Sequence, residues 1–353
     1  MMRADFPVLA AYYSDIPNMG DQLNPLIIDR LFGYAVVRGS LERSEAFVLG
    51  SCLGKLSKRK NRQRVSVWGT GFISYDDAEP SPDLNVDYRA VRGNLTKRRI
   101  ESRLGKKLNI PVADPGLLSS LLLDAPVNKE YELGVIAHYR ERKDPRFVKL
   151  KGLAKSVLMI DVLDSPLSVI RKIASCRRIL SSSLHGLIIS DSLGIPNLHI
   201  KVTDDLRGDG FKFDDYYSSF DVSHEFVDLN TETIDSLDII NRRYRIKPVA
   251  VAAKQRQLME AFPFPKVERT DDSRVSAFVL LVPWGVLRLW ARRRFGVKAI
   301  VSGRRTAWFG LKRMLKFGLP FGVVAGLRAR RFNVPMASVL SGGALIRTLN
   351  WRW

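Results

Sequence analysis

The residues best suited to chemistry lie in one short segment, residues 181–196. The run SSSLHG at 181–186 leads into an apolar stretch that closes on Gly194-Ile195-Pro196. Ser183 is a favourable N-cap, and Gly194 before Pro196 is a stop signal, so we expect a short helix directly after a strand. The free amides and the dipole at the start of such a helix attract an anion.

Two residues in the first turn of this helix are candidates for binding and catalysis. His185 has a side chain that titrates near neutrality and can donate a proton, and Gly186 allows a ligand to approach the backbone closely. A second interpretation stays open on spacing alone: His185 caps the helix or packs in the core, and Gly186 packs against a neighbour. The polar serine run favours a site.

The other candidate metal or redox residues are dispersed. Cys52 and Cys176 lie far apart and in no ligand spacing, which excludes a disulfide scaffold and a cysteine zinc site and fits a reducing compartment. The four histidines are also scattered, so we expect no required metal and no cofactor. They are His138, His185, His199 and His224.

The charge of the chain is concentrated at one end. The 353 residues carry a formal net charge of +21, and residues 273–353 contain 16 Lys and Arg and no Asp or Glu. Subtracting 16 from 21 leaves +5 for residues 1–272, an ordinary value for a globular protein. With 46% hydrophobic residues the chain can bury a core, so global disorder is excluded.

Apolar runs of strand length alternate with helical patterns up to about residue 245. This βα alternation predicts an α/β protein with two parallel sheets, that is, two Rossmann-like lobes. The first apolar run reads as a buried strand and not as a signal peptide. Strands are expected at 6–13, 34–37, 46–49, 65–68, 86–91, 133–137, 157–160, 178–182 and 197–200. Helices are expected at 24–32, 95–104, 166–174, 183–193 and 231–244.

The predicted domains follow from this alternation. The segment APVNK at 125–129 interrupts it and indicates a linker, because proline and asparagine favour turns. We expect an N-terminal lobe at 1–126 and a C-terminal lobe at 127–265. The last helices of the second lobe are expected to pack back on the first lobe. A basic, aromatic, helical tail is expected at 266–353.

A set of motifs along the chain resembles, in type and order, those of the polysaccharide pyruvyl transferase family. The resemblance is closest to its succinoglycan-type exopolysaccharide branch. The resemblance spans roughly residues 8–245 and implies two lobes of the GT-B type. The C-terminal signature is SLHG followed by an apolar helix and SLGIP. The other motifs are NMGDQLNP at 18–25, WGTG at 68–71, VRG at 91–93, ADPGL at 113–117 and KFDDYY at 212–217.

The resemblance implies a reaction and its participants. Phosphoenolpyruvate would be the co-substrate, and a sugar of a bacterial surface-glycan precursor, such as a lipid-linked oligosaccharide, would accept pyruvate as a ketal. His185 would protonate the donor, and Asp21 would take the acceptor proton unless it is only a turn residue. The helix start, Ser182, Ser183, Leu184 and Gly186, would bind the donor.

The sequence departs from the family at one position that bears on donor binding. Many members carry arginine two residues before the histidine, where this chain has Ser183. Another cation must then hold the donor, and we expect Arg140 first and Lys212 second. Arg92, at the end of an apolar strand, would contact the donor or an anionic acceptor unless it is a solvated charge.

Two loops of the first lobe are candidate acceptor-side elements. The Asn-x-Gly-Asp loop contributes Asn18, Gly20 and Asn24. The glycine loop Gly69-Thr70-Gly71 either cradles a phosphate or only makes a tight turn, and the turn is favoured.

The tail interleaves cations with five of the six tryptophans. Its longest apolar run, 275–287, is too short and too broken by Pro283 and Gly285 to span a bilayer. Cations among Trp and Leu favour helices in the interface of an anionic membrane, so we expect a cytoplasmic protein attached peripherally to the inner leaflet. A single-stranded nucleic-acid arm and a poorly ordered tail are the alternatives, and we expect no nucleic-acid partner.

Two other functions compete with pyruvyl transfer. A nucleotide-sugar glycosyltransferase of GT-B type shares the two-lobed architecture and uses a helix start for a diphosphate. A non-catalytic glycan- or membrane-binding relative is the other alternative, since Ser183 replaces a donor-binding arginine.

Overall fold

The computed structural model describes residues 8–12, 16, 18–203 and 208–265. The chain divides into two compact units, one of residues 8–32 and 38–265 and one of residues 1–7, 33–37 and 266–353. The fold described below is that of the larger unit. The expected tail and the two ends of the first expected strand lie outside the described residues.

The first lobe is built on a parallel sheet. Its strands pair in the order β1 (Val8–Ala11), β3 (Ala46–Phe47), β4 (Val65–Trp68) and β5 (Val86–Ala90), and β2 (Val36–Arg38) lies between β1 and β3 in sequence. Its helices are α1 (Met19–Phe32) and α2 (Asn94–Leu104), with 3₁₀ helices at Leu53–Lys58 and Pro115–Leu122. The buried, apolar β4 is typical of a parallel sheet covered on both faces.

The second lobe has a five-stranded parallel sheet. Its order is β7 (Val157–Ile160), β6 (Leu133–Ile136), β8 (Ile179–Ser181), β9 (Asn197–Lys201) and β10 (Phe226–Asp228). The chain therefore leaves β6 to one side for β7 and returns to its other side as β8. Such a reversal opens a crevice at the carboxyl ends of the two strands, where α/β proteins bind ligands.

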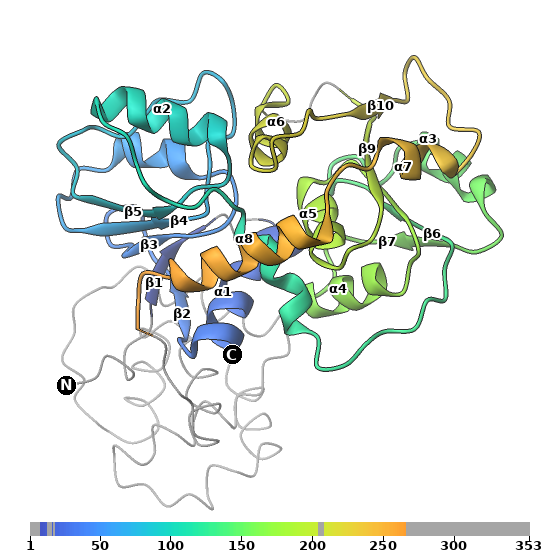
Figure 1. Cartoon of the computed structure of the whole chain (residues 1–353), viewed down its shortest axis with the longest axis horizontal. Helices are drawn as coiled ribbons and strands as arrows, with labels where there is room; N and C mark the ends of the chain where they lie inside the picture. The colour runs from blue at the N-terminus through green and yellow to red at the C-terminus, as the bar shows by residue number, and fades with distance from the viewer. Residues whose placement is uncertain (1–7, 13–15, 17, 204–207, 266–353) are drawn as a thin grey trace, which may run out of the picture. The chain divides into compact units, whose positions relative to one another are not determined.

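Helices connect the strands of the second lobe (Figure 1). They are α3 (Pro145–Lys149), α4 (Pro166–Ala174), α5 (Leu184–Ser192) and α6 (Phe211–Ser218), with a 3₁₀ helix at Leu150–Leu153. Helices α7 (Asp238–Arg243) and α8 (Pro248–Glu260) follow β10. The α/β architecture with two parallel sheets, expected from the sequence, is thus confirmed.

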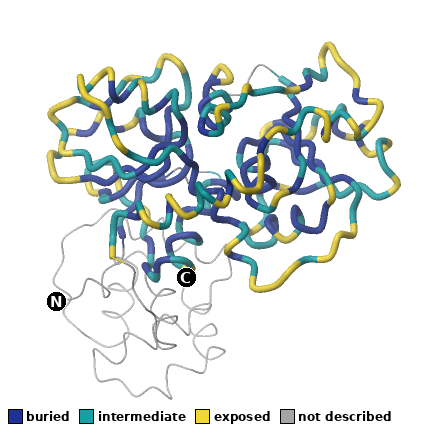
Figure 2. Tube along the Cα trace, in the orientation of Figure 1, coloured by how far each residue is buried: buried dark blue, intermediate teal, exposed yellow. Residues whose placement is uncertain are grey.

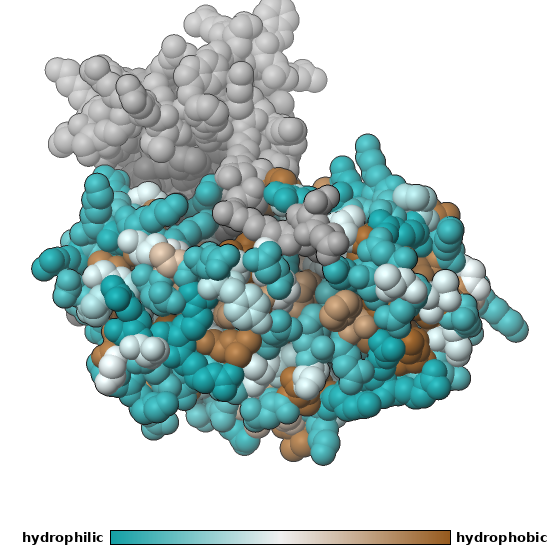
Figure 3. All heavy atoms as spheres, turned by 90° about the horizontal axis from the view of Figure 1, so that it is seen from above, coloured by the Kyte–Doolittle hydropathy of each residue, from teal (hydrophilic) through white to brown (hydrophobic). Residues whose placement is uncertain are grey.

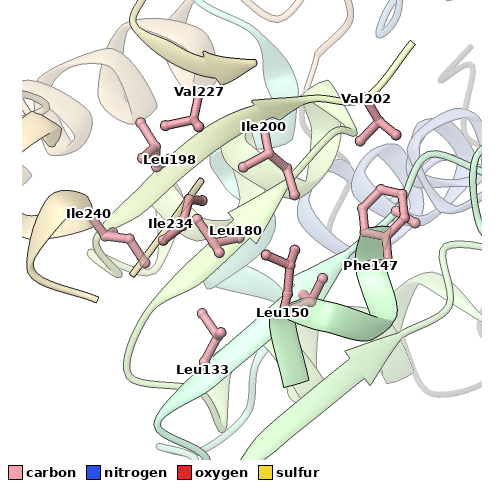
Figure 4. Close-up of a cluster of buried hydrophobic side chains, with 12 residues drawn as sticks. Leu133, Phe147, Leu150, Leu180, Leu198, Ile200, Val202, Val227, Ile234 and Ile240 are labelled. Carbon is pink, nitrogen blue, oxygen red and sulfur yellow. The ribbon is translucent and has the colours of Figure 1, made fainter. Parts of the chain in front are cut away.

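The core of the second lobe is apolar and continuous (Figure 4). Side chains from β6, β8, β9 and β10 pack with residues of α3 and α7. The buried parts of the trace lie in the interior of the lobe (Figure 2). Leu133, Leu180 and Ile200 have no exposed surface. One face of the molecule is mostly hydrophilic with separate small apolar patches (Figure 3).

Helix α1 begins five residues earlier than the helix expected at 24–32. Proline has no N–H for a hydrogen bond in a helix interior. In the structure Pro25 lies inside α1, and the Asn24 side chain donates to the Asp21 carbonyl at 3.0 Å. This side-chain bond replaces the missing backbone bond and lets the helix start at Met19.

The helix expected at 231–244 is shorter than predicted, and only α7 is helical there. The Asp228 carboxylate accepts from the backbone N–H of Asn230, and the Asp228 carbonyl accepts from Thr231, which fixes a turn. Ile234 is buried in the core cluster, and the Ser236 hydroxyl accepts from the N–H of Asp238. Because Ile234 is held in the core and Ser236 caps the following turn, the helix begins at Asp238 and not at Thr231.

Helix α8, in the second half of the chain, packs on the first lobe. The Trp68 indole N–H donates to the Leu258 carbonyl at 3.0 Å, and the Gln255 amide donates to the Leu117 carbonyl at 2.7 Å. The rings of Phe32 and Phe262 stack with centroids 3.6 Å apart. In Figure 1 α8 extends from the first lobe toward α5, so this helix joins the two lobes.

Helix α6 is also held by the first lobe. The Arg92 Nε donates to the Asp215 carboxylate at 2.9 Å, and both side chains are completely buried. The same carboxylate accepts from the backbone N–H and the hydroxyl of Thr96, at 2.7 Å each. A Cβ on Gly93 would overlap the Asp215 carbonyl, so α6 lies directly against the start of α2.

No helix among the described residues is long and apolar enough to cross a membrane.

Candidate active site

A cavity of about 450 Å³ lies where the carboxyl ends of the two sheets meet. From the second lobe it is lined by the residues after β6 and β8, on both sides of the chain reversal, and from the first by those after β3 and the start of α1. The lining residues are Asn18, Asp21, Leu49, Gly50, Ser51, Cys52, Gly54, Lys55, Ser57, Lys58, Ile73, Asp76, Asp77, Ala78, His138, Tyr139, Arg140, Ser183, Leu184, His185 and Lys212.

The start of α5 forms one wall of this cavity. The helix spans Leu184–Ser192 with Ser183 at the N-cap, as the sequence predicted within one residue. The Ser183 hydroxyl makes no capping bond, and the turn is held by the Ser181 hydroxyl, which accepts from the Ser183 N–H at 3.0 Å. The helix start therefore has no side-chain cap, which leaves its positive end suited to an anion.

His185 is held close to the start of α1. A Cβ on Gly20 would overlap His185 Nδ1, so glycine at position 20 is required by this approach. The ring is half-buried, and its Nε2 is buried without a hydrogen-bond partner among the described residues. Burial, together with Lys212, Arg92 and His138, lowers the pKa of His185 to about 3.

This environment makes His185 neutral in the empty site. An anion bound in the cavity would offset the surrounding positive charge and raise the pKa of His185 again. An anionic ligand would therefore favour the protonated form of His185.

Four cationic side chains line the cavity among the described residues: Lys55, Lys58, Arg140 and Lys212. Burial, and then the charge of Arg92, lowers the pKa of Lys212 to about 8. The exposed Arg140 donates from Nε to the Tyr139 hydroxyl at 3.2 Å. The two cations expected to replace the missing family arginine are both present in the cavity.

Asp21 lies in the first turn of α1, on the first-lobe side of the cavity. Its carboxylate accepts from the Asn18 side chain at 2.6 Å. Burial raises the pKa of Asp21 to about 7, although Lys55 and Arg38 act in the opposite direction. A carboxyl group that titrates near neutrality is suited to accept a proton.

Other predicted site residues lie behind the cavity wall. The Ser182 hydroxyl accepts from the His138 N–H at 2.9 Å, and Asn24 accepts from the Leu49 N–H at 2.9 Å. Both side chains position residues that do line the cavity. A Cβ on Gly186 would overlap Ser181 Oγ and press on Ile136, so this glycine serves helix–strand packing and does not line the cavity.

The glycine loop after β4 is an internal turn. Gly69 has φ of 86°, and a Cβ there would overlap Pro115. The Thr70 hydroxyl donates to the Gly50 carbonyl at 2.7 Å and accepts from the Cys52 N–H at 3.2 Å. A Cβ on Gly71 would lie 2.7 Å from the Arg92 guanidinium. None of the three lines the cavity.

Arg92 is engaged on all sides by protein atoms. Besides the bond to Asp215, it donates to the Ser51 hydroxyl at 2.6 Å and to the Phe72 carbonyl at 2.5 Å. It is fully buried and lies behind Ser51, which lines the cavity. The structure therefore gives Arg92 contacts that join α6 to the first lobe and does not bring it into the cavity.

Two cavity cations were not predicted from the sequence. Lys55 and Lys58 lie in the 3₁₀ helix that follows β3. The run GSCLGK at 50–55 carries a usable signal, because glycine and lysine directly after a strand often form an anion-binding loop. Within residues 8–12, 16, 18–203 and 208–265, no three His, Cys, Asp or Glu side chains gather into a metal-binding group.

Comparison with known proteins identifies the family to which this fold and site belong. The sequence profile of the polysaccharide pyruvyl transferase family matches residues 18–205, more than half of the chain, so the chain belongs to this family. An uncharacterised protein of Acanthamoeba polyphaga mimivirus is 26% identical over 267 residues, which cover 69% of this chain and 91% of that protein.

Among solved structures, a functionally uncharacterised protein of Klebsiella pneumoniae is similar with a TM-score of 0.38 and 15% identity. The match covers 64% of this chain and 94% of that chain.

Proposed function

We propose that this protein transfers pyruvate from phosphoenolpyruvate to a sugar of a surface-glycan precursor and forms a cyclic ketal. The observation that carries the proposal is the composition of the cavity. It combines an uncapped helix start, a neutral histidine among cations and, on the opposite lobe, a carboxyl group with a pKa of about 7. On the basis of the sequence motifs, we also propose that the protein belongs to the succinoglycan-type branch of the family and that its two lobes resemble the GT-B architecture.

The donor carries two anionic groups, and the cavity offers two kinds of anion holder. The phosphate binds at the start of α5 beside Lys212, and the carboxylate binds Arg140. In this arrangement Lys212 and Arg140 together take the role of the arginine that many relatives carry at position 183. Binding of the donor offsets the cations that lower the pKa of His185, so that His185 acquires a proton.

The reaction then follows in balanced steps. His185 gives its proton to the methylene carbon of the donor, which becomes a methyl group and leaves an oxocarbenium-like carbon. A sugar hydroxyl attacks this carbon and loses its proton to Asp21. The carbon–oxygen bond to phosphate breaks, a second hydroxyl attacks the same carbon, and its proton leaves with inorganic phosphate.

The direct test is incubation of the purified full-length protein with phosphoenolpyruvate and lipid-linked oligosaccharides. We expect inorganic phosphate and an acid-labile pyruvylated glycan in equal amounts, measured by phosphate assay and mass spectrometry. Turnover of nucleotide sugars without turnover of phosphoenolpyruvate would assign the cavity to glycosyl transfer. Binding of glycan without any turnover would favour the non-catalytic alternative.

We also propose that residues 266–353 attach the protein to the cytoplasmic face of an anionic membrane. The support is the sequence, since 16 cations, five tryptophans and no carboxylates fall within residues 273–353. Deletion from Ser276 onward should abolish binding to anionic vesicles and leave turnover of a short lipid-free acceptor. Equal vesicle binding by the full-length and the truncated protein would contradict the membrane proposal. Binding of the full-length protein to single-stranded nucleic acid and not to vesicles would favour the nucleic-acid arm.

A further inference from the structure

A row of hydrogen-bonded side chains links the first turn of α6 to the first lobe and to β9. The Tyr75 hydroxyl, from the segment between β4 and β5, donates to Asp214 Oδ2 at 3.0 Å. The other oxygen of this carboxylate lies 2.9 Å from His224 Nδ1, and His224 Nε2 lies 2.9 Å from Nδ1 of His199 on β9. We call these four residues the α6 network, and the reaction proposed above gives them no role.

The charges of the α6 network are well defined at its two ends. Although burial acts to raise it, hydrogen bonds from His224 and Tyr75 lower the pKa of Asp214 below its usual value, so this group is a carboxylate. A carboxylate only accepts hydrogen bonds, and therefore His224 Nδ1 carries a proton. Burial first, and then nearby positive groups that include Lys212, hold the pKa of His199 well below its usual value. His199 is therefore neutral and adds no positive charge beside Lys212.

Ring contacts connect the α6 network to Lys212. The ring of His199 stacks on Phe213 with centroids 4.0 Å apart and planes inclined by 18°. The ring of His224 lies parallel to the same phenyl ring, with centroids 5.3 Å apart and planes inclined by 9°. The Lys212 ammonium lies 5.2 Å from the centroid of Phe213, within the range of a cation–π contact. The ring beside this ammonium is thus held by both histidines.

Lys212 has no polar anchor of its own. Its side chain lines the cavity and, within the residues that the structure describes, makes no hydrogen bond or ion pair. The start of α6 also lacks a side-chain cap, because its N-cap is Gly210 with φ of 80°. The place of Lys212 in the cavity therefore depends on the contacts that Phe213 and Asp214 make in the first turn.

We infer that His199 and His224 are positioning residues for Lys212, which they hold in the cavity so that its ammonium meets an anion at the start of α5. A lysine that is already held in place loses less rotamer freedom when the anion binds, so the anion binds more tightly. The identity of this anion as the donor phosphate rests on the proposed function, whereas the positioning of Lys212 does not.

The test is calorimetric titration of phosphoenolpyruvate into the purified full-length protein. His224→Phe keeps an aromatic ring beside Phe213 and removes both hydrogen bonds, so the Kd should rise about tenfold. The same substitution in a Lys212→Ala background should change the Kd less than about twofold, because no lysine is left to position. In transfer assays His224→Phe should raise the KM for the donor and leave kcat unchanged. An equal loss of affinity with and without Lys212 overturns the positioning role.

Two further variants separate positioning from folding. Ser218 holds the last turn of α6, where its hydroxyl accepts from the Asn94 N–H at 2.9 Å. Ser218→Ala should therefore lower the melting temperature and leave the Kd unchanged, and a rise in its Kd as large as that of His224→Phe overturns the positioning role. Tyr75→Phe removes only the outer bond of the α6 network and should raise the Kd about threefold. If His224→Phe does not fold, an unchanged Kd in Tyr75→Phe overturns the positioning role.

The proposed function and the positioning role fail in different ways. A wild type that does not bind phosphoenolpyruvate rejects the proposed function, and the same titrations with inorganic pyrophosphate then decide the role of the two histidines. A wild type that binds neither anion overturns both, since Lys212 would then hold no anion.

Discussion

Helices α1 and α5 both begin at the cavity, yet their first turns are satisfied in opposite ways. At α1 the side-chain Oδ1 of Asn18 accepts from the Gly20 N–H at 2.9 Å, and Asp21 places a carboxyl group in the first turn. At α5 the N-cap Ser183 makes no such bond. The chain thus supplies its own negative partner at α1 and leaves the start of α5 available to a ligand.

The proposed reaction uses this difference, with the donor at α5 and the acceptor at α1. An anionic donor gains most at the helix start that lacks a carboxylate, and an acceptor hydroxyl needs the carboxylate at the other. In the proposed reaction, two helices that begin at the same cavity therefore differ in role through the side chains of their first turns.

The strongest test of the comparison is His185→Asn. The variant removes the proton donor at the start of α5, so the rate of pyruvyl transfer should fall about 1,000-fold, within the usual range for general acid–base groups. The melting temperature should stay close to that of the wild type, because asparagine is small enough to remain beside Gly20. A loss of less than about tenfold would make His185 a structural residue.

Asp21→Asn tests the opposite helix start. Transfer should fall about 100-fold, because the amide cannot accept the acceptor proton. In the wild type the rate should rise with pH through about 7, as the Asp21 carboxyl ionises. An unchanged pH profile in the variant would remove Asp21 from the reaction.

The same group gives a signed prediction for stability. Its pKa is raised in the folded protein from 3.8 to about 7, so between these values the folded state keeps a proton that the unfolded chain has lost. The stabilisation of the folded state by the protonated Asp21 is therefore fully present below about pH 4, and it is lost as the pH rises through 7. Urea unfolding at pH 5 and pH 8 should show Asp21→Asn gaining stability relative to the wild type at the higher pH.

Lys212→Ala should weaken donor binding at the α5 side about tenfold, which corresponds to about 1.4 kcal/mol. Donor affinity of the wild type should also decline above about pH 8, as Lys212 loses its proton, and this decline should be absent from the variant. Calorimetry with phosphoenolpyruvate measures both effects. Lys151→Ala, at an exposed lysine outside the cavity, is the control. Equal affinities of the wild type and Lys212→Ala for phosphoenolpyruvate would assign donor binding to Arg140 alone.

The smallest expected effects come from substitutions at the N-cap positions of the two helices, Asn18 of α1 and Ser183 of α5. Asn18→Ala removes the bond to the Gly20 N–H and should lower the free energy of unfolding by about 1 kcal/mol. Ser183→Ala removes no capping bond and should change it by less than about 0.5 kcal/mol. Equal losses in denaturant titrations would show that the two helix starts do not differ as described.

The parts of the fold that were predicted from the sequence are those with strong local signals. The serine run before α5 and the Gly-Ile-Pro after it define both ends of that helix within one residue. The apolar runs of β4 and β7 were also predicted with their observed bounds. In these segments local preference and tertiary burial agree, and so a single sequence suffices.

The contacts that complete the site depend on segments far apart in the chain. Helix α6 was not predicted, because its short sequence FKFDDYYS has no long apolar periodicity and its main partner, Arg92, lies 123 residues from Asp215. For the same reason the role of Arg92 as a buried partner of α6 could not be seen. The glycine at position 69 was recognisable, whereas the crowding by Pro115 that requires it was not.

The buried pair of Arg92 and Asp215 has a consequence for recombination between relatives. A chimera joined at residue 126 would follow the lobe boundary in sequence. It would, however, take Arg92 from one parent protein and Asp215 from the other. If the incoming half lacks a carboxylate at the position of Asp215, Arg92 is left charged and buried, at a cost of about 3–5 kcal/mol. Exchange of the first lobe between relatives would therefore require α6 to be exchanged with it.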